Sequence, residues 1–271
     1  MSRSYRKKGE GAVRLDSYRE TWLHRTNPSV KLLVMIGVFF VVLFLHNPNV
    51  LINLSVGLLL LFFLYTGYPM KYLVLFFLPF FVIFVSTASS MTFFGQGTTT
   101  WVRWGLVHIT KESFFRGMHL GFRALSFALL GLIFSLTTRP VYLFYSLMQQ
   151  LKVKPKYAYS FLAGVRLIPM MIEEFQTVQN ALKVRGADGG GIVNKMKRYA
   201  VPLLSQSIRR AQRIAVAMEA KRFSDAKNRT FYYQIGVSRY DVIFFVWMIG
   251  LIGLSYYMAT VFPYFPVTDV R

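Results

Sequence analysis

The chain has 271 residues, a formal net charge of +21 and a hydrophobic fraction of 54%. This apolar fraction exceeds that of an average soluble domain and indicates a membrane protein. The sequence contains no cysteine, which excludes disulfides, thiolate nucleophiles and thiolate metal sites.

Five apolar stretches carry few or no charges and are about as long as membrane-spanning helices. At a rise of about 1.5 Å per residue, roughly 20 helical residues cross the hydrocarbon core of a bilayer. The first stretch is at the short end of this range. We therefore expect five spans, at residues 30–46, 50–66, 72–91, 117–136 and 241–262.

The cations are unevenly distributed along the chain. They gather before the first span and in residues 139–239, whereas the turn at 46–49 has neither lysine nor arginine. Because cytoplasmic loops carry the excess of Lys and Arg, we expect the N-terminus and the long basic region to be cytoplasmic. The positive-inside bias, together with attraction to an anionic inner leaflet, accounts for most of the high charge. No nucleic-acid-binding motif is visible, so the expected partners include a lipid bilayer and no nucleic acid.

The spans divide the chain into three parts. Residues 1–136 hold an N-terminal cytoplasmic segment and the first four spans, and residues 137–239 form a polar region of amphipathic helices. Residues 240–271 hold the last span and a short external tail. The sequence thus predicts an all-α membrane protein with about five transmembrane helices, and with cytoplasmic amphipathic helices between the fourth and the fifth.

Two long basic helices are predicted in the cytoplasmic region, and each is amphipathic beyond a proline, Pro169 or Pro202. On the second helix an apolar seam alternates steps of three and four residues, as in a coiled coil. The small residues of the seam are expected to allow a close approach to the first helix. The seam comprises Val201, Leu204, Ile208, Ala211, Ala215 and Met218.

The two helices end alike, with alanine in the last turn and a cation at the tip. The first end contains Ala181, Val184, Arg185 and Gly186, and the second contains Ala217, Ala220, Lys221 and Arg222. A cation followed by glycine is also ordinary helix termination, because it satisfies the last carbonyls and the helix dipole. The second end has no such glycine. Two cationic helix ends outside the lipid therefore indicate contact with a soluble partner.

Arg123 lies inside the fourth predicted span. An arginine at that depth is functional unless it snorkels to the headgroups, and the sequence leaves both interpretations open. The four histidines lack the spacing of metal ligands, and no G-x-x-x-x-G-K-[ST] motif occurs. We expect no catalytic residue, metal or cofactor in this chain, and no ATP hydrolysis by it.

Several short motifs recur in one known family at similar spacing. They are Leu23-His24-Arg25-Thr26-Asn27-Pro28 with Lys31, Gly121-Phe122-Arg123, Thr137-Thr138, Arg166-Leu167-Ile168-Pro169 with Glu173-Glu174, Val184-Arg185-Gly186 and Ala220-Lys221-Arg222. Together they resemble, over nearly the whole chain, the transmembrane T component of energy-coupling factor (ECF) transporters of vitamins and metals. The last two motifs stand where that family has its Ala-Arg-Gly signatures.

The resemblance implies a non-enzymatic coupling subunit that joins a substrate-binding membrane subunit, the S component, to two ABC-type ATPases. Such a complex takes up a vitamin, a vitamin precursor or a metal ion through the plasma membrane of a prokaryote. The resemblance also makes the amphipathic helices coupling helices whose ends insert into grooves on the ATPases. Arg185 would contact one ATPase and Lys221 the other.

The second signature departs from the family, because Lys221 replaces arginine and Arg222 replaces glycine. Either Lys221 acts as a point charge, or Arg222 makes the contact from one position along the helix. The apolar seam, continued, aims Arg222 at the neighbouring helix. This favours Lys221 as the ATPase contact and Arg222 as an intramolecular clamp.

Two other functions are alternatives to the coupling role. An ABC permease that carries its own substrate needs an E-A-A-x-x-x-G docking loop between spans, and none is found in the sequence. An intramembrane enzyme needs paired Asp, His or Ser residues within the spans. Asp241, at the edge of the last span, is the only carboxylate near the lipid.

Overall fold

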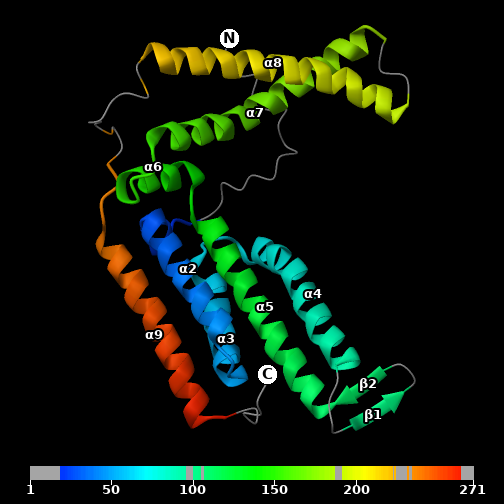
Figure 1. Cartoon of the computed structure of the whole chain (residues 1–271), viewed down its shortest axis with the longest axis vertical. Helices are drawn as coiled ribbons and strands as arrows, with labels where there is room; N and C mark the ends of the chain where they lie inside the picture. Colours follow the sequence, from blue (N-terminus) through cyan, green and yellow to red (C-terminus); the bar gives the residue numbers. More distant parts are fainter. Residues whose placement is uncertain are drawn as a thin grey trace. The chain divides into compact units, whose positions relative to one another are not determined.

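A computed structural model describes residues 19–95, 100–104, 107–186, 191–221, 223, 231 and 234–263 of the chain. It divides into two compact units. The membrane unit comprises Met1–Arg139 and Gly236–Arg271, and the coupling unit comprises Pro140–Ile235. The chain therefore crosses from one unit to the other twice, once after Arg139 and once before Gly236 (Figure 1).

The described part of the membrane unit consists of helices and one small β-hairpin. Its helix α5 packs against α2, α3 and α4, and α9 packs against α2 and α3 (Figure 1). Strands β1 and β2 pair in an antiparallel hairpin before α5. The elements are α1 (Trp22–Arg25), α2 (Pro28–Phe44), α3 (Pro48–Tyr65), α4 (Met70–Phe94), β1 (Thr100–Trp104), β2 (Val107–Thr110), α5 (Lys111–Thr137) and α9 (Arg239–Val261).

Two of these helices begin with the same dipeptide. Asn27 and Asn47 each precede a proline, and their side chains accept hydrogen bonds from the backbone N–H groups of Ser29 and Asn49. Proline suits the first helical position because its missing N–H would have no partner there. The sequence therefore fixes the starts of α2 and α3 locally.

Among the described residues four helices, α3, α4, α5 and α9, are long and apolar enough to cross a membrane. They contain 18, 25, 27 and 23 residues, and α2 is an apolar helix of 17 residues. The predicted class, an all-α membrane protein, is confirmed. At about 1.5 Å per residue α2 is about 26 Å long, so its crossing of the bilayer stays a prediction.

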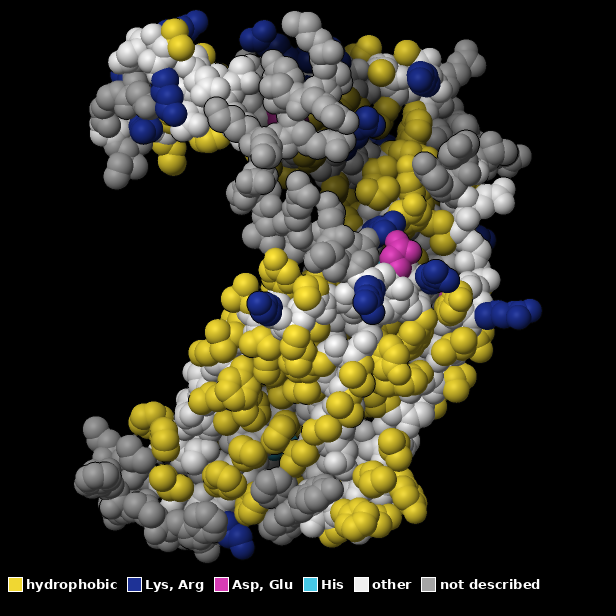
Figure 2. All heavy atoms as spheres, turned by 180° about the vertical axis from the view of Figure 1, so that it is seen from behind, with side chains coloured by type: hydrophobic (Ala, Val, Ile, Leu, Met, Phe, Trp, Pro, Cys, Tyr) yellow, Lys and Arg dark blue, Asp and Glu magenta, His cyan; other side chains and the backbone are white. Residues whose placement is uncertain are grey.

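The surface of the membrane unit is largely apolar on the face that Figure 2 shows. Helix α4 illustrates this, because Leu73 is its only buried residue. Water would make so large an exposed apolar area unfavourable, whereas lipid tails or another membrane subunit would not. Exposed apolar residues of α4 include Val74, Leu75, Leu78, Val82 and Ile83.

In the part of the coupling unit that the structure describes there are three helices, α6 (Pro140–Gln150), α7 (Pro155–Val184) and α8 (Ile192–Ala220). Helix α7 packs against both α6 and α8. Pro169 and Pro202 lie inside α7 and α8, which continue on both sides of them. The amphipathic halves that the sequence predicted are therefore the C-terminal parts of longer helices.

Candidate docking site on the amphipathic helices

The end of α7 presents Arg185 as its C-cap residue, with φ −80° and ψ 3°. The Arg185 N–H donates to the Ala181 carbonyl oxygen at 3.2 Å, and the Gly186 N–H donates to the Lys183 carbonyl oxygen at 3.1 Å. Gly186 has φ +63°, the left-handed conformation that glycine adopts without a steric cost. Val184, the last helical residue, is 88% exposed. These two hydrogen bonds close the last turn of α7 through backbone groups alone, and the Arg185 side chain is exposed.

The end of α8 repeats this geometry around Lys221. Lys221 is the C-cap residue, with φ −86° and ψ 11°, and its N–H donates to the Ala217 carbonyl oxygen at 3.3 Å. Ala217, Ala220 and Lys221 are all exposed. Lys221 therefore occupies the backbone position in α8 that Arg185 occupies in α7. Arg222, the other predicted contact at this end, lies outside the described residues.

Helices α7 and α8 cross, and their contacts are partly polar (Figure 1). The Ser207 hydroxyl donates to the Met171 Sδ at 2.9 Å, and Arg210 forms an ion pair with Glu174. The Phe175 and Tyr199 rings contact each other with their centroids 5.2 Å apart. These side chains set where along each helix the crossing lies.

The structure places the predicted apolar seam of α8 differently from the expectation. Leu204 and Ile208 are 62% and 58% exposed, and Ala211 and Ala215 are exposed as well, while Met218 is partly buried. The stripe that contacts α7 instead contains Ser207 and Arg210, whose polar groups have partners on α7. Since consecutive helical residues lie about 100° apart, the seam faces away from this contact. The expected close approach of α7 to Ala211 and Ala215 is corrected accordingly.

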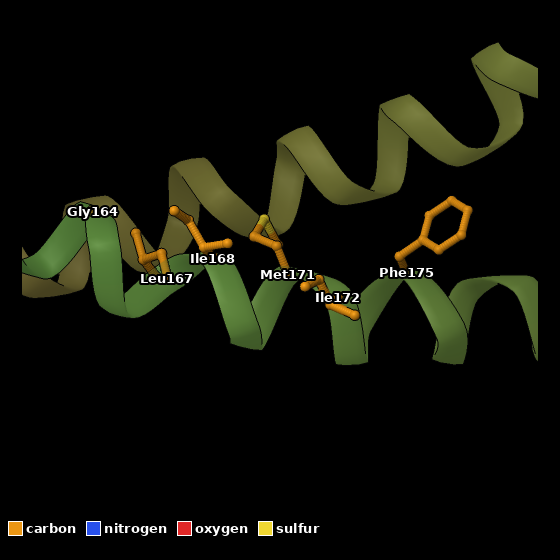
Figure 3. Close-up of a pocket in the computed structure, with 6 residues that line it drawn as sticks. All are labelled: Gly164, Leu167, Ile168, Met171, Ile172 and Phe175. Atoms are coloured by element: carbon orange, nitrogen blue, oxygen red, sulfur yellow. The ribbon is translucent and has the colours of Figure 1, made fainter. Parts of the chain in front are cut away.

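An apolar groove runs along α7 on the N-terminal side of its cationic end (Figure 3). Its volume is about 430 Å³, and Ile168 and Ile172 are 60% and 56% exposed. The six lining residues are Gly164, Leu167, Ile168, Met171, Ile172 and Phe175. The groove offers no ionisable side chain for chemistry, and within the described ranges no group of His, Asp or Glu residues could hold a metal ion. The surface is therefore suited to apolar contact.

Arg123 of α5 lies in the membrane unit and is distant in sequence from the ends of α7 and α8. Its guanidinium donates to the carbonyl oxygen of Leu45, the C-cap residue of α2, at 2.7 Å. The carbonyls at a helix C-terminus lack intrahelical partners and carry partial negative charge, which favours a cation. Of the two interpretations that the sequence left open, this contact supports a paired arginine that joins α5 to α2.

A buried polar group at the start of α2 was not predicted as a site. Lys31 and Asp241 are 1% and 2% exposed, although they lie 210 residues apart in sequence. Buried charged residues need hydrogen-bonding partners, so such a group is a structural or functional feature. Its signal in the sequence was the spacing of Asn27 and Lys31, one helical turn apart in a motif that the family resemblance had already singled out.

Comparison with known proteins supports a single family. Residues 19–232 match the CbiQ family, described as "Cobalt transport protein". A protein of Macrococcus caseolyticus named "Energy-coupling factor transporter transmembrane protein EcfT" is 25% identical over 253 residues, covering 88% of this chain and 94% of the relative. Proteins with the same name from Brevibacillus brevis and Limosilactobacillus fermentum are 26% and 27% identical, covering 87% and 88% of this chain and 90% and 93% of the relatives. The family resemblance read from the sequence is thereby confirmed, and the chain belongs to the CbiQ family of transmembrane transporter components.

Proposed function

We propose that this chain is the non-enzymatic coupling subunit of an ATP-driven ECF-type importer, with its N-terminus in the cytoplasm of a prokaryotic cell. The observation that carries this proposal is the equivalence of Arg185 and Lys221, each the C-cap residue of a long amphipathic helix. Two similar ends fit two similar partners. The names of the relatives, which are transmembrane proteins of ECF transporters, support this assignment.

Each helix end has the properties of a docking element for an ABC-type ATPase. The backbone hydrogen bonds at each helix end hold the Cα atom of the terminal cation in a defined place, so the backbone there loses little conformational freedom when a partner binds. Arginine can bind a carboxylate through two parallel hydrogen bonds, whereas lysine offers a point charge. Around these cations lie small or exposed residues that let a groove close over the end: Ala181, Val184, Gly186, Ala217 and Ala220.

The apolar faces of the coupling unit suit a second partner, the membrane-embedded S component. The α7 groove exposes Ile168 and Ile172, and the seam of α8 exposes Leu204 and Ile208. Apolar surfaces of this kind are covered by apolar partners or by lipid. In this proposal the S component binds the substrate, a vitamin, a vitamin precursor or a metal ion. ATP hydrolysis resides in the ATPase chains.

The proposal is tested by purifying the chain in mild detergent from the cells in which it occurs naturally. We expect the tagged chain to recover ABC-type ATPases at two per chain, together with one small membrane subunit. Recovery of the chain alone, under conditions that preserve other membrane complexes, would contradict the proposal. A chain that transports substrate by itself in vesicles would instead identify the permease alternative.

The two proposed surfaces can be separated with matched variants. Ile208→Glu places a charge on the apolar seam of α8 and should release the S component while the ATPases stay bound. Gln212→Glu introduces the same charge one turn further along the helix at an exposed polar position and serves as its control. Loss of the ATPases from Ile208→Glu, with the S component retained, would reverse the assignment of the surfaces.

A further inference from the structure

Lys31 is almost completely buried, with 1% of its surface exposed, near the start of α2. Its ammonium donates to the Leu23 carbonyl oxygen at 2.5 Å, the Thr137 carbonyl oxygen at 3.2 Å and the Thr137 hydroxyl oxygen at 3.1 Å. An ammonium has three donors, and each has an acceptor here. Lys31 therefore fastens the beginning of α2 to the last residue of α5.

Asn27, one helical turn before Lys31, makes the corresponding contacts with the segment before α9. The Asn27 N–H donates to the Asp241 Oδ1 at 2.5 Å, and its side-chain amide donates to the Gly236 carbonyl oxygen at 3.1 Å. The Asp241 Oδ2 in turn accepts from the Ser238 N–H at 2.7 Å. The buried carboxylate thus holds both its own chain segment and the start of α2.

These contacts coincide with the two places where the chain passes between the units. Thr137 lies two residues before the first crossing, which follows Arg139, and Gly236 is the first residue after the second crossing. Both crossings are therefore tied to the same helical turn, from Asn27 to Lys31. We call Asn27, Lys31, Thr137 and Asp241 the crossing clamp.

We propose that the crossing clamp holds the two chain crossings at a fixed separation, and that it transmits movement of the coupling unit to the membrane helices. The inference rests on the proposed coupling function and adds positioning residues to it. A helix end held by a single contact could swivel when the coupling unit moves. Two crossings fastened to one rigid turn move together, and α2 moves with them.

The chemistry of the clamp suits this role. Its donors and acceptors are withdrawn from water, so breaking one contact leaves another buried polar group without a partner. The clamp is therefore held in one arrangement rather than in many. By contrast, Glu20 and Arg139 form an ion pair at the first crossing with side chains 53% and 52% exposed, and such surface pairs constrain little.

The separation of the crossings can be measured directly, because the sequence contains no cysteine that would interfere with labelling. Spin labels on Val141→Cys and Val237→Cys, both exposed and each beside one crossing, report a distance distribution in the assembled complex. We expect Lys31→Met to broaden this distribution about twofold and to lower transport per ATP hydrolysed about tenfold, within the usual range of coupling effects. Thr137→Val and Asp241→Asn, which remove fewer contacts, should change both quantities in the same direction by less.

Glu20→Gln is the matched control, since it removes the exposed ion pair at the same crossing and should change neither quantity. A distribution and a transport ratio that match the wild type in both Lys31→Met and Asp241→Asn would overturn the inference. A lower yield of complex with an unchanged ratio would also overturn it, because that result describes a purely structural role. If the wild-type chain recovers no ATPase, the coupling function fails instead, and the distance distribution still tests the clamp in the chain alone.

Discussion

Glu174 of α7 and Arg210 of α8 form an ion pair where the two helices cross. Their side chains are 18% and 27% exposed, so the pair is partly withdrawn from water and is stronger than an ordinary surface pair. Ser207 contacts Met171 one turn away, which gives the crossing a second fixed point. The direction in which the ends at Arg185 and Lys221 point therefore depends on this pair.

Removing one partner of the pair should loosen the crossing. We expect Glu174→Gln to cost about 1.5–3 kcal/mol of stability, the range for hydrogen bonds to charged groups. The midpoint of thermal unfolding in detergent should fall, and less ATPase should co-purify because the two ends no longer hold their relative direction. Both quantities can be measured on the same purified sample.

The adjacent carboxylate provides a control for the Glu174 variant. Glu173 is exposed, and Glu173→Gln removes the same charge without breaking the crossing. Exchanging the partners, by Glu174→Arg together with Arg210→Glu, should restore part of the lost stability. Equal effects of Glu173→Gln and Glu174→Gln would show that the change in net charge, and not the crossing, is responsible.

Arg185→Glu should detach one ATPase. In the proposed contact with an ATPase carboxylate, replacing the cation by an anion turns attraction into repulsion, which costs about 2–5 kcal/mol of binding free energy. We expect membrane insertion to stay normal while ATPase recovery and transport fall. Lys183→Glu, two residues earlier on the same exposed end, is the control. If the Arg185→Glu variant recovers as much ATPase as the wild type, Arg185 acts only as a helix cap and not as an ATPase contact.

The helices could be predicted from the sequence because their signals are local. Apolar runs of sufficient length indicated the spans, and Gly186 with its φ of +63° ends α7 where the sequence placed the stop. Asn27-Pro28 and Asn47-Pro48 begin α2 and α3. The family resemblance rested on equally short motifs. It could therefore be recognised without any knowledge of long-range contacts.

Features that depend on distant residues could not be predicted in this way. The hydrophobic period of α8 predicted that Leu204 and Ile208 lie in the helix contact, but both are exposed. Arg210 instead bonds Glu174, which is 36 residues away in sequence, so the face of α8 that carries Arg210 lies against α7. The hairpin of β1 and β2 was missed because each strand is short, with 5 and 4 residues. The alternation in Thr100–Trp104, rich in tryptophan and valine, was a usable strand signal.

Arg123 should contribute to the stability of the membrane unit through α2. Arg123→Met leaves the Leu45 carbonyl oxygen without this donor, and we expect a loss of about 1–3 kcal/mol. Arg123→Lys retains a cation at the end of α2 and should lose less. Thermal unfolding of the purified chain in detergent measures both variants. Equal stability of Arg123→Met and the wild type would indicate that the arginine can be replaced by lipid contact.

The orientation of the chain can be tested with single cysteines, since none occurs naturally. His46 and Lys71 are exposed; His46 lies just before α3, and Lys71 lies in the first turn of α4, which follows α3. With the N-terminus in the cytoplasm, an impermeant maleimide added to intact cells should label His46→Cys and not Lys71→Cys. Permeabilised cells should show both labels. The reverse pattern would invert the topology and would place the helix ends at Arg185 and Lys221 outside the cell.

Either Lys221 or Arg222 makes the second proposed ATPase contact, and charge reversal at each residue distinguishes them. Lys221 has nearly the same backbone angles as Arg185, and both are C-cap residues that donate to an alanine four residues earlier. A groove that accepts Arg185 in this geometry can accept Lys221 in the same way. Arg222, which stands one position beyond this C-cap in the sequence, lies outside the described residues. We therefore expect Lys221→Glu to release one ATPase, and Arg222→Glu to leave it bound. Co-purification of the ATPases with each variant measures this. If Arg222→Glu loses an ATPase while Lys221→Glu keeps both, Arg222 makes the second contact.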